Sequence, residues 1–172
     1  MKKQLLTLLF FLSFHYTHAQ VAICQYFGKN ASDHKLGFET FAYFSIPIDK
    51  ESYTKSVVIE LLDVAFLPTK NPEPVGETIG YLSIKAGYKK VFSDTRTGFF
   101  IEPQFGYADV INYATQGGDT RSGVAVAMIG GYNLGVGQKF NSLQFDLKYE
   151  EDIAGANYTV GTLGLRTSFA FD

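Results

Sequence analysis

Apolar and polar residues alternate along much of the chain, most strictly at 143–150. The odd positions of this segment, from Leu143 to Tyr149, are all apolar or aromatic, and the even positions, from Gln144 to Glu150, are all polar or charged. Successive side chains of a strand point to opposite faces of a sheet, so this period of two predicts an amphipathic β-strand. Beyond residue 19, no window of a dozen residues shows the apolar spacing of a helix.

Seven further segments extend the pattern. Four alternate clearly, at 36–46, 81–89, 99–108 and 162–171, and three alternate more weakly, at 20–28, 54–66 and 123–134. Pro103 cannot donate a ladder hydrogen bond, so we expect a bulge or bend there. The period slips at Leu61-Leu62-Asp63, as a β-bulge would cause. The sequence predicts eight antiparallel strands, each about nine or more residues long, which is enough to cross a membrane when tilted.

The first nineteen residues resemble a cleavable export signal. Lys2 and Lys3 precede an apolar run at 5–14, and Thr17-His18-Ala19 offers small residues where a signal peptidase cuts. The run is far shorter than the roughly 20 residues of a spanning helix. We therefore expect a signal peptide at 1–19 and one domain at 20–172.

The predicted connections differ in length along the chain. The longest are the third, at 68–78, and the fifth, at 109–122. If both ends of the domain lie in the periplasm, the odd-numbered connections face the outside and the even-numbered ones form short periplasmic turns. This asymmetry is typical of bacterial outer-membrane barrels.

Composition excludes several kinds of site. After removal of 1–19 the chain holds 13 Lys and Arg against 17 Asp and Glu, a formal charge of −4, with no basic stripe for nucleic acid. Cys24 is the only cysteine, so a disulfide within the chain and a typical zinc site are excluded, and the polar residues before it disfavour lipidation. Calcium binding by Asp109 and Asp119 has no support in their spacing. We expect no cofactor and no metal.

Catalysis would require a histidine placed beside a nucleophile and an acid. The domain holds one histidine, His34, next to Ser32 and Asp33. Neighbouring residues of an extended chain point to opposite sides, so these three make a poor triad. We expect a solvated loop histidine and no enzyme.

Alternation alone does not say which face is inside, because a soluble barrel turns its apolar row inward. The polar rows here consist largely of Gly, Ala, Ser and Thr with single charges, four of each sign, a mixture that suits a narrow polar lumen. Buried charges must be paired. We therefore expect an internal charge network, and the alternative is that several of its members are solvated near a barrel mouth. Its expected members are Glu39, Lys85, Glu102, Asp146, Lys148 and Arg166.

Aromatic residues near the predicted strand ends support a lipid-facing outer surface, since barrels carry aromatic girdles at both membrane interfaces. Good strand propensity alone would also explain them. The expected girdle residues are Tyr88, Phe92, Phe99, Tyr107, Tyr149, Tyr158, Phe169 and Phe171.

Three stretches, at 80–88, 97–107 and 163–171, resemble the outer-membrane protein β-barrel domain family, the small OmpA/OmpX-like barrels. The likeness covers nearly all of 20–172. It implies eight antiparallel strands, periplasmic termini, residence in the bacterial cell outer membrane and insertion by the barrel-assembly machinery. That machinery reads a C-terminal aromatic residue in this family, whereas here Asp172 follows Phe171.

The expected protein is thus an all-β, up-and-down transmembrane barrel in contact with outer-membrane lipid. We expect a monomer with a structural or surface-binding role, whose outer loops meet a ligand that the sequence does not identify. Two alternatives stay open: a narrow transport channel, although eight strands leave room only for side chains, and a soluble secreted lipid-binding barrel with the opposite facing.

Overall fold

The fold was analysed in a computed structural model, which describes residues 18–27, 31–49, 51–70, 79–112, 119–135, 142–154 and 159–170. The described part contains eight strands and one short 3-10 helix, η1 (Ala31–Asp33). The strands are β1 (His18–Phe27), β2 (Gly37–Pro47), β3 (Lys55–Leu67), β4 (Ile79–Val91), β5 (Gly98–Asn112), β6 (Asp119–Gly135), β7 (Ser142–Ile153) and β8 (Thr159–Ala170). All eight predicted strands are confirmed.

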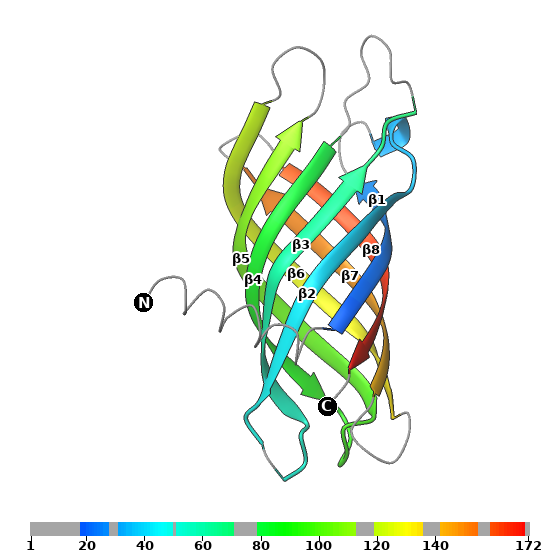
Figure 1. The fold of residues 1–172 in the computed structure, drawn as a ribbon, viewed down its shortest axis with the longest axis vertical. Helices are drawn as coiled ribbons and strands as arrows, with labels where there is room; N and C mark the ends of the chain where they lie inside the picture. Colours follow the sequence, from blue (N-terminus) through cyan, green and yellow to red (C-terminus); the bar gives the residue numbers. More distant parts are fainter. Residues whose placement is uncertain are drawn as a thin grey trace, which may run out of the picture.

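The strands form one closed antiparallel barrel (Figure 1). Each strand pairs with the next along the chain, and β1 pairs with β8 to close the cylinder. The start of β1 and the end of β8 lie at the end of the barrel that also carries the β2–β3 and β4–β5 turns (Figure 1). We call this the terminal end and the opposite one the loop end. The strand β1 begins at His18, and the predicted signal peptide otherwise lies outside the described residues.

The barrel is polar inside and apolar outside. Along β7, Asp146, Lys148 and Glu150 are buried, whereas Phe145 and Leu147, which alternate with them, are about half exposed. Twenty-nine large hydrophobic residues of the described chain are exposed. This is the facing of a transmembrane barrel and the reverse of a soluble one. No helix among the described residues is long and apolar enough to cross a membrane.

A β-bulge lies in the middle of β3, as the slipped period predicted. The register shifts between Glu60 and Asp63 against β4, and Leu61 and Leu62 both point outward. Glu60 and Asp63 are therefore both buried, with no exposed surface. Two consecutive outward residues place two acids inside the barrel.

Of the bulge or bend predicted at Pro103, the bulge is wrong. Pro103 pairs with Met128 in an unbroken β5–β6 register, and the β4–β5 register is the same on both sides of it. The β4–β5 ladder only lacks pairs for Tyr88 and Lys89. Here β4 approaches closely, because a Cβ on Gly87 would collide with the carbonyl oxygen of Pro103. The ladder is thus interrupted over two residues of β4 without an extra residue in either strand.

The predicted aromatic girdles are outward where the structure describes them. Tyr88, Phe92, Phe99, Tyr107 and Tyr149 are exposed on the outer wall. Tyr158 and Phe171, together with the side chain of Phe169, lie outside the described residues.

Candidate functional site

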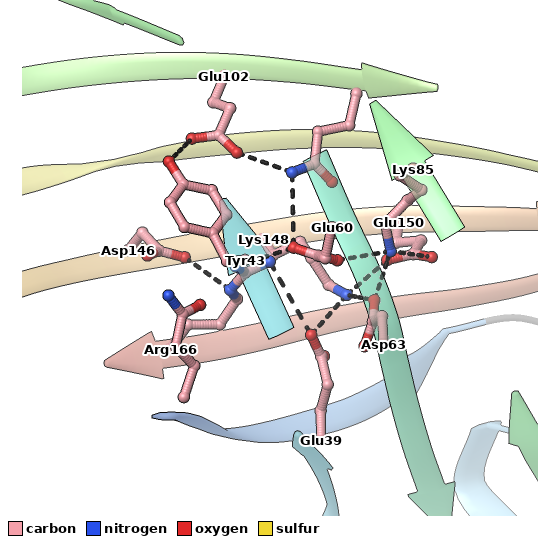
Figure 2. Close-up of polar contacts among 12 residues, drawn as sticks. Glu39, Tyr43, Glu60, Asp63, Lys85, Glu102, Asp146, Lys148, Glu150 and Arg166 are labelled. Atoms are coloured by element: carbon pink, nitrogen blue, oxygen red, sulfur yellow. Dashed lines mark hydrogen bonds and ion pairs between the residues drawn. The ribbon is translucent and has the colours of Figure 1, made fainter. Parts of the chain in front are cut away.

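The six predicted network residues all point into the barrel, from β2, β4, β5, β7 and β8. Each is at most 3% exposed. Figure 2 shows them with Glu60, Asp63, Glu150 and Tyr43 as one group of polar side chains in the lumen. None of the six is solvated at a barrel mouth.

Lys85 on β4 is surrounded by carboxylates. Its Nζ lies 3.0 Å from Glu60 Oε1 and 2.6 Å from Glu150 Oε2, and it also contacts Asp63 Oδ2. Ser83 Oγ accepts a further hydrogen bond from it at 2.8 Å. The three acids come from β3 and β7, so this one ammonium group ties strands on opposite walls of the barrel.

Lys148 on β7 makes a second such centre. Its Nζ lies 2.6 Å from Glu39 Oε1, 2.7 Å from Asp63 Oδ2 and 2.5 Å from Glu150 Oε2. It also donates to Tyr81 Oη at 3.3 Å. Because Asp63 and Glu150 serve both lysines, the two centres are one continuous network.

Arg166 on β8 extends the network toward the terminal end. Its Nη2 lies 3.2 Å from Glu60 Oε2 and its Nε 3.2 Å from Asp146 Oδ1. The guanidinium also lies 3.6 Å from the centre of the Phe41 ring, a cation–π distance. The long side chain is thus held both by charge and by a ring that excludes water.

Glu102 is held differently from the other acids. It accepts hydrogen bonds from Tyr43 Oη at 3.3 Å and from Gln104 Nε2 at 2.7 Å. The nearby ammonium of Lys89 lies 4.0 Å from the centre of the Phe100 ring and contacts Gln144 Oε1. Within the described chain, Glu102 is therefore stabilised by neutral donors and not by an ion pair.

The expected balance of four charges of each sign is wrong. Seven acids and four bases are buried inside the described barrel. The acids are Glu39, Glu60, Asp63, Glu102, Asp146, Glu150 and Asp152, and the bases are Lys85, Lys89, Lys148 and Arg166. The lumen holds three more acids than bases.

Sequence reasoning missed Glu60, Asp63 and Asp152. The bulge disguised the first two, because a strict period of two carries only one of them inward. Asp152 lies beyond the predicted end of its strand, yet alternation continued from Glu150 would have placed it inside. Neither oxygen of Asp152 has a hydrogen-bond partner in the described structure.

Three of the seven buried acids could together hold a metal ion. Carboxylate oxygens of Glu60, Asp63 and Glu150 lie within 4.8 Å of one another. The Lys85 ammonium contacts all three. The cationic position among them is thus taken by a side chain of the protein itself.

Apolar clusters lie above and below the network. Toward the loop end, Tyr26, Leu67, Ile79, Val110 and Val160 belong to one buried cluster. Toward the terminal end, Val91, Phe100 and Ile129 form another. The loop-end cluster includes residues of β1, β3, β4, β5 and β8 and forms an apolar plug across the lumen. The terminal-end cluster lies on β4, β5 and β6 alone, and buried polar residues such as Gln20 and Gln144 lie at the same end.

His34 is buried, which contradicts the expected solvated loop histidine. Its ring meets the Tyr26 ring edge-on at a centroid distance of 4.9 Å, and Nδ1 lies 3.4 Å from the Leu67 carbonyl oxygen. Ser32 Oγ bonds to Asp33 at 3.2 Å. His34 thus packs over the apolar plug, and these three residues do not form a relay.

The first and third connections join above this plug. His34 pairs with Thr69 in an isolated bridge, Lys35 N donates to Pro68 O at 2.8 Å and Lys70 N donates to Asp33 O at 2.7 Å. We call residues 31–35 and 68–70 the loop-end platform. It makes an ordered surface at the loop end.

No family model and no curated protein sequence matches this chain. Solved structures do match it. Neisserial surface protein A (NspA) superposes with a TM-score of 0.66 and 13% identity, covering 90% of this chain and 94% of its own. Ail, the attachment invasion locus protein of Yersinia pestis, crystallised with the heparin analogue sucrose octasulfate, has a TM-score of 0.59 and 13% identity, covering 91% and 96%. A second Ail structure has a TM-score of 0.52 and 14% identity, again covering 91% and 96%. At these identities the likeness shows the fold, a closed eight-stranded barrel along nearly the whole chain.

Proposed function

We propose that this chain is an integral protein of the bacterial outer membrane with a non-enzymatic, structural or surface-binding role. The observation that carries the proposal is the facing of the barrel, in which charges lie inside and an apolar wall lies outside. Such a wall is unstable in water and stable in a bilayer. The predicted signal peptide at 1–19 and the likeness to surface barrels agree with export to that membrane.

The lumen supports a closed barrel over a transport channel. An eight-stranded barrel has an interior just wide enough for side chains. Here that interior contains an ion-pair network that crosses from wall to wall beneath an apolar plug at the loop end. A solute would have to break several buried ion pairs to pass.

The loop-end platform supports contact with the outside. Its backbone hydrogen bonds give it a fixed shape, and Lys35 and Lys70 are exposed on it. The similar proteins bear the names of a surface protein and an attachment protein. An ordered, exposed loop end suits the same kind of role.

Membrane fractionation followed by electrophoresis of unheated and boiled samples tests the location. We expect the protein in the outer-membrane fraction, with a band that shifts only after boiling. Recovery in the soluble periplasmic fraction without a shift would refute the proposal and favour the soluble lipid-binding alternative.

Labelling of intact cells with a membrane-impermeant amine reagent tests the orientation. Lys35 and Lys70 lie at the loop end, and the equally exposed Lys55 and Lys90 lie at the terminal end, as a matched pair. We expect label on the first pair in intact cells and on both pairs after lysis. Label confined to Lys55 and Lys90 in intact cells would contradict the proposed orientation.

Conductance across a planar bilayer tests the closed lumen. We expect the folded protein to leave the conductance at background. Stable steps well above background would support the channel alternative and refute a closed structural barrel.

A further inference from the structure

An apolar groove of about 540 Å³ lies on the outer wall at β5, β6 and β7. Its lining includes Ile101, Gly130, Tyr132, Phe145 and Leu147. A Cβ placed on Gly130 would meet no atom within 4 Å, so the missing side chain leaves a hollow between its outward neighbours. On a wall that faces hydrocarbon, this hollow needs an apolar occupant.

The groove belongs to a continuous row of paired residues. Lys90 pairs with Ile101, Ile101 with Gly130, Gly130 with Leu147 and Leu147 with Leu165. Lys90 is the second-last residue of β4, whereas Gly130 lies five residues from the terminal end of β6. The row therefore rises from the rim of the terminal end into the apolar wall. Adjacent strands are about 4.8 Å apart, so Gly130 is roughly 10 Å from Lys90 along it.

Two lysines stand at the low end of this row. Lys55, the first residue of β3, pairs directly with Lys90, and both side chains are exposed on the outer wall. Like charges directly opposite one another destabilise a sheet unless an anion neutralises them. The ammonium of Lys90 also lies 5.4 Å from the centre of the ring of Phe92, which lines the groove. The cationic pair and the groove thus meet at an aromatic residue.

Asp49 lies near enough to Lys55 to attract it, and its carboxylate also accepts hydrogen bonds from the Ser52 hydroxyl and, at 3.2 Å, from the Glu51 amide. Among the described residues, neither Lys55 nor Lys90 forms a salt bridge. Both ammonium groups can therefore bind an external anion.

We propose that this row is a phospholipid site: Lys55 and Lys90 hold the headgroup phosphate, and one acyl chain lies in the groove over Gly130. The inference rests on the proposed insertion into a membrane. The ligand is a phospholipid of the leaflet at the terminal end, because its phosphate would meet the cationic pair at the rim and its acyl chain the apolar groove above it. A second copy of the chain would fill the groove but would bring an identical cationic pair.

Native mass spectrometry of the detergent-solubilised, folded protein with phosphatidylglycerol tests the site. Each Lys near an anionic lipid surface contributes about 1 kcal/mol, so Lys55→Gln/Lys90→Gln, which removes two, should retain about thirtyfold less of this lipid than the unchanged protein. The matched control Lys35→Gln/Lys70→Gln removes the same charge at the loop end and should retain it fully. Equal retention by both double variants would overturn the proposal.

The acyl-chain half of the site has its own test. Gly130→Leu places a side chain in the hollow, where a Cβ meets no atom within 4 Å, and should reduce retention of phosphatidylglycerol and of diacylglycerol, which has no phosphate. Ala86→Leu, which adds a similar side chain at an exposed position of β4, should change neither. Retention unaffected by Gly130→Leu, or a dimer that this variant abolishes, would overturn the proposal. Electrophoresis of unheated and boiled samples shows whether each variant is folded. Absence of the heat-dependent shift would mean that the barrel itself is not formed. A retained shift with unaltered lipid binding would mean that the barrel is present and the proposed lipid site is wrong.

Discussion

Arg166 illustrates how the interior charges stabilise the fold. Removing a guanidinium from water is costly, and here the cost is offset by Glu60 and Asp146 at 3.2 Å and by the Phe41 ring. Breaking one partner of such a buried group leaves the other charges uncompensated. The energetic effect of a substitution in this lumen therefore depends on whether it removes a base or an acid.

Substitution of Arg166 by Met should destabilise the barrel by about 3–5 kcal/mol, because Asp146 loses its ion-pair partner and Glu60 keeps only Lys85 within the described chain. Urea unfolding of protein inserted in vesicles measures this change. Arg121→Met, which removes an exposed arginine of β6, should cost less than about 1 kcal/mol. Equal costs for the two variants would show that the buried network does not support the fold.

Substitution of Asp152 by Asn should leave stability unchanged or raise it. Asp152 belongs to an acid surplus and lacks hydrogen-bond partners for both oxygens, so loss of its charge relieves repulsion. Lys85→Met should instead cost about 3–5 kcal/mol, since Glu60, Asp63 and Glu150 each lose one of the two cations that they contact among the described residues. Urea unfolding compares the two variants. A loss of unfolding free energy for Asp152→Asn as large as that for Lys85→Met would contradict a destabilising surplus of buried acids.

At the scale of strands and turns, two devices depart from regular alternation. The bulge in β3 turns both Leu61 and Leu62 outward and brings Glu60 and Asp63 into the same lumen. The β2–β3 turn is closed by Asp49, which accepts hydrogen bonds from Ser52 and Glu51. Tyr53 in the same turn has a positive φ of 54°, a conformation that costs free energy in a non-glycine residue.

Deletion of Leu62 should leave the barrel able to fold. Without this residue Glu60, Leu61 and Asp63 alternate strictly, and the Glu60–Lys85 and Asp63–Ser83 pairs keep their register. We therefore expect the deletion variant to retain the heat-dependent gel shift, as the control Leu62→Ala should. Loss of the shift in the deletion variant alone would show that the bulge is required for folding.

The Asp49 turn should stabilise the fold in a pH-dependent manner. Hydrogen bonds from the Ser52 side chain, then from the backbone amides of Ser52 and Glu51, lower the pKa of the Asp49 carboxyl below its usual 3.8. Its contribution is therefore present above that value and is lost as the pH falls through the lower folded-state pKa. Asp49→Ala should be less stable than the unchanged protein at pH 7, with a difference that vanishes in strong acid. A difference independent of pH would assign the effect to the backbone alone.

At the scale of the whole molecule, alternation predicted most of the fold and part of the site. The eight strands follow from a period of two. The inward direction of residues such as Lys85 and Arg166 follows instead from the small and oppositely charged residues of the polar rows, and the barrel topology from the family resemblance. The ion-pair partner of each buried charge does not follow from alternation. That Lys85 meets Glu60 across the lumen depends on barrel closure and register, and the acid surplus depends on a bulge whose two acids no strict period places together. The burial of His34 likewise required the contact between the first and third connections.

The central claim is that the apolar wall of a charged-core barrel faces lipid. Spin labels at Phe145, Leu147 and Tyr149, introduced one at a time as cysteines in a Cys24→Ala background, test it most directly in protein folded into vesicles. These positions are outward on β7 and about half exposed. We predict high collision rates with oxygen, which concentrates in hydrocarbon, and low rates with a water-soluble nickel complex. High nickel and low oxygen collision rates at all three positions would contradict the claim.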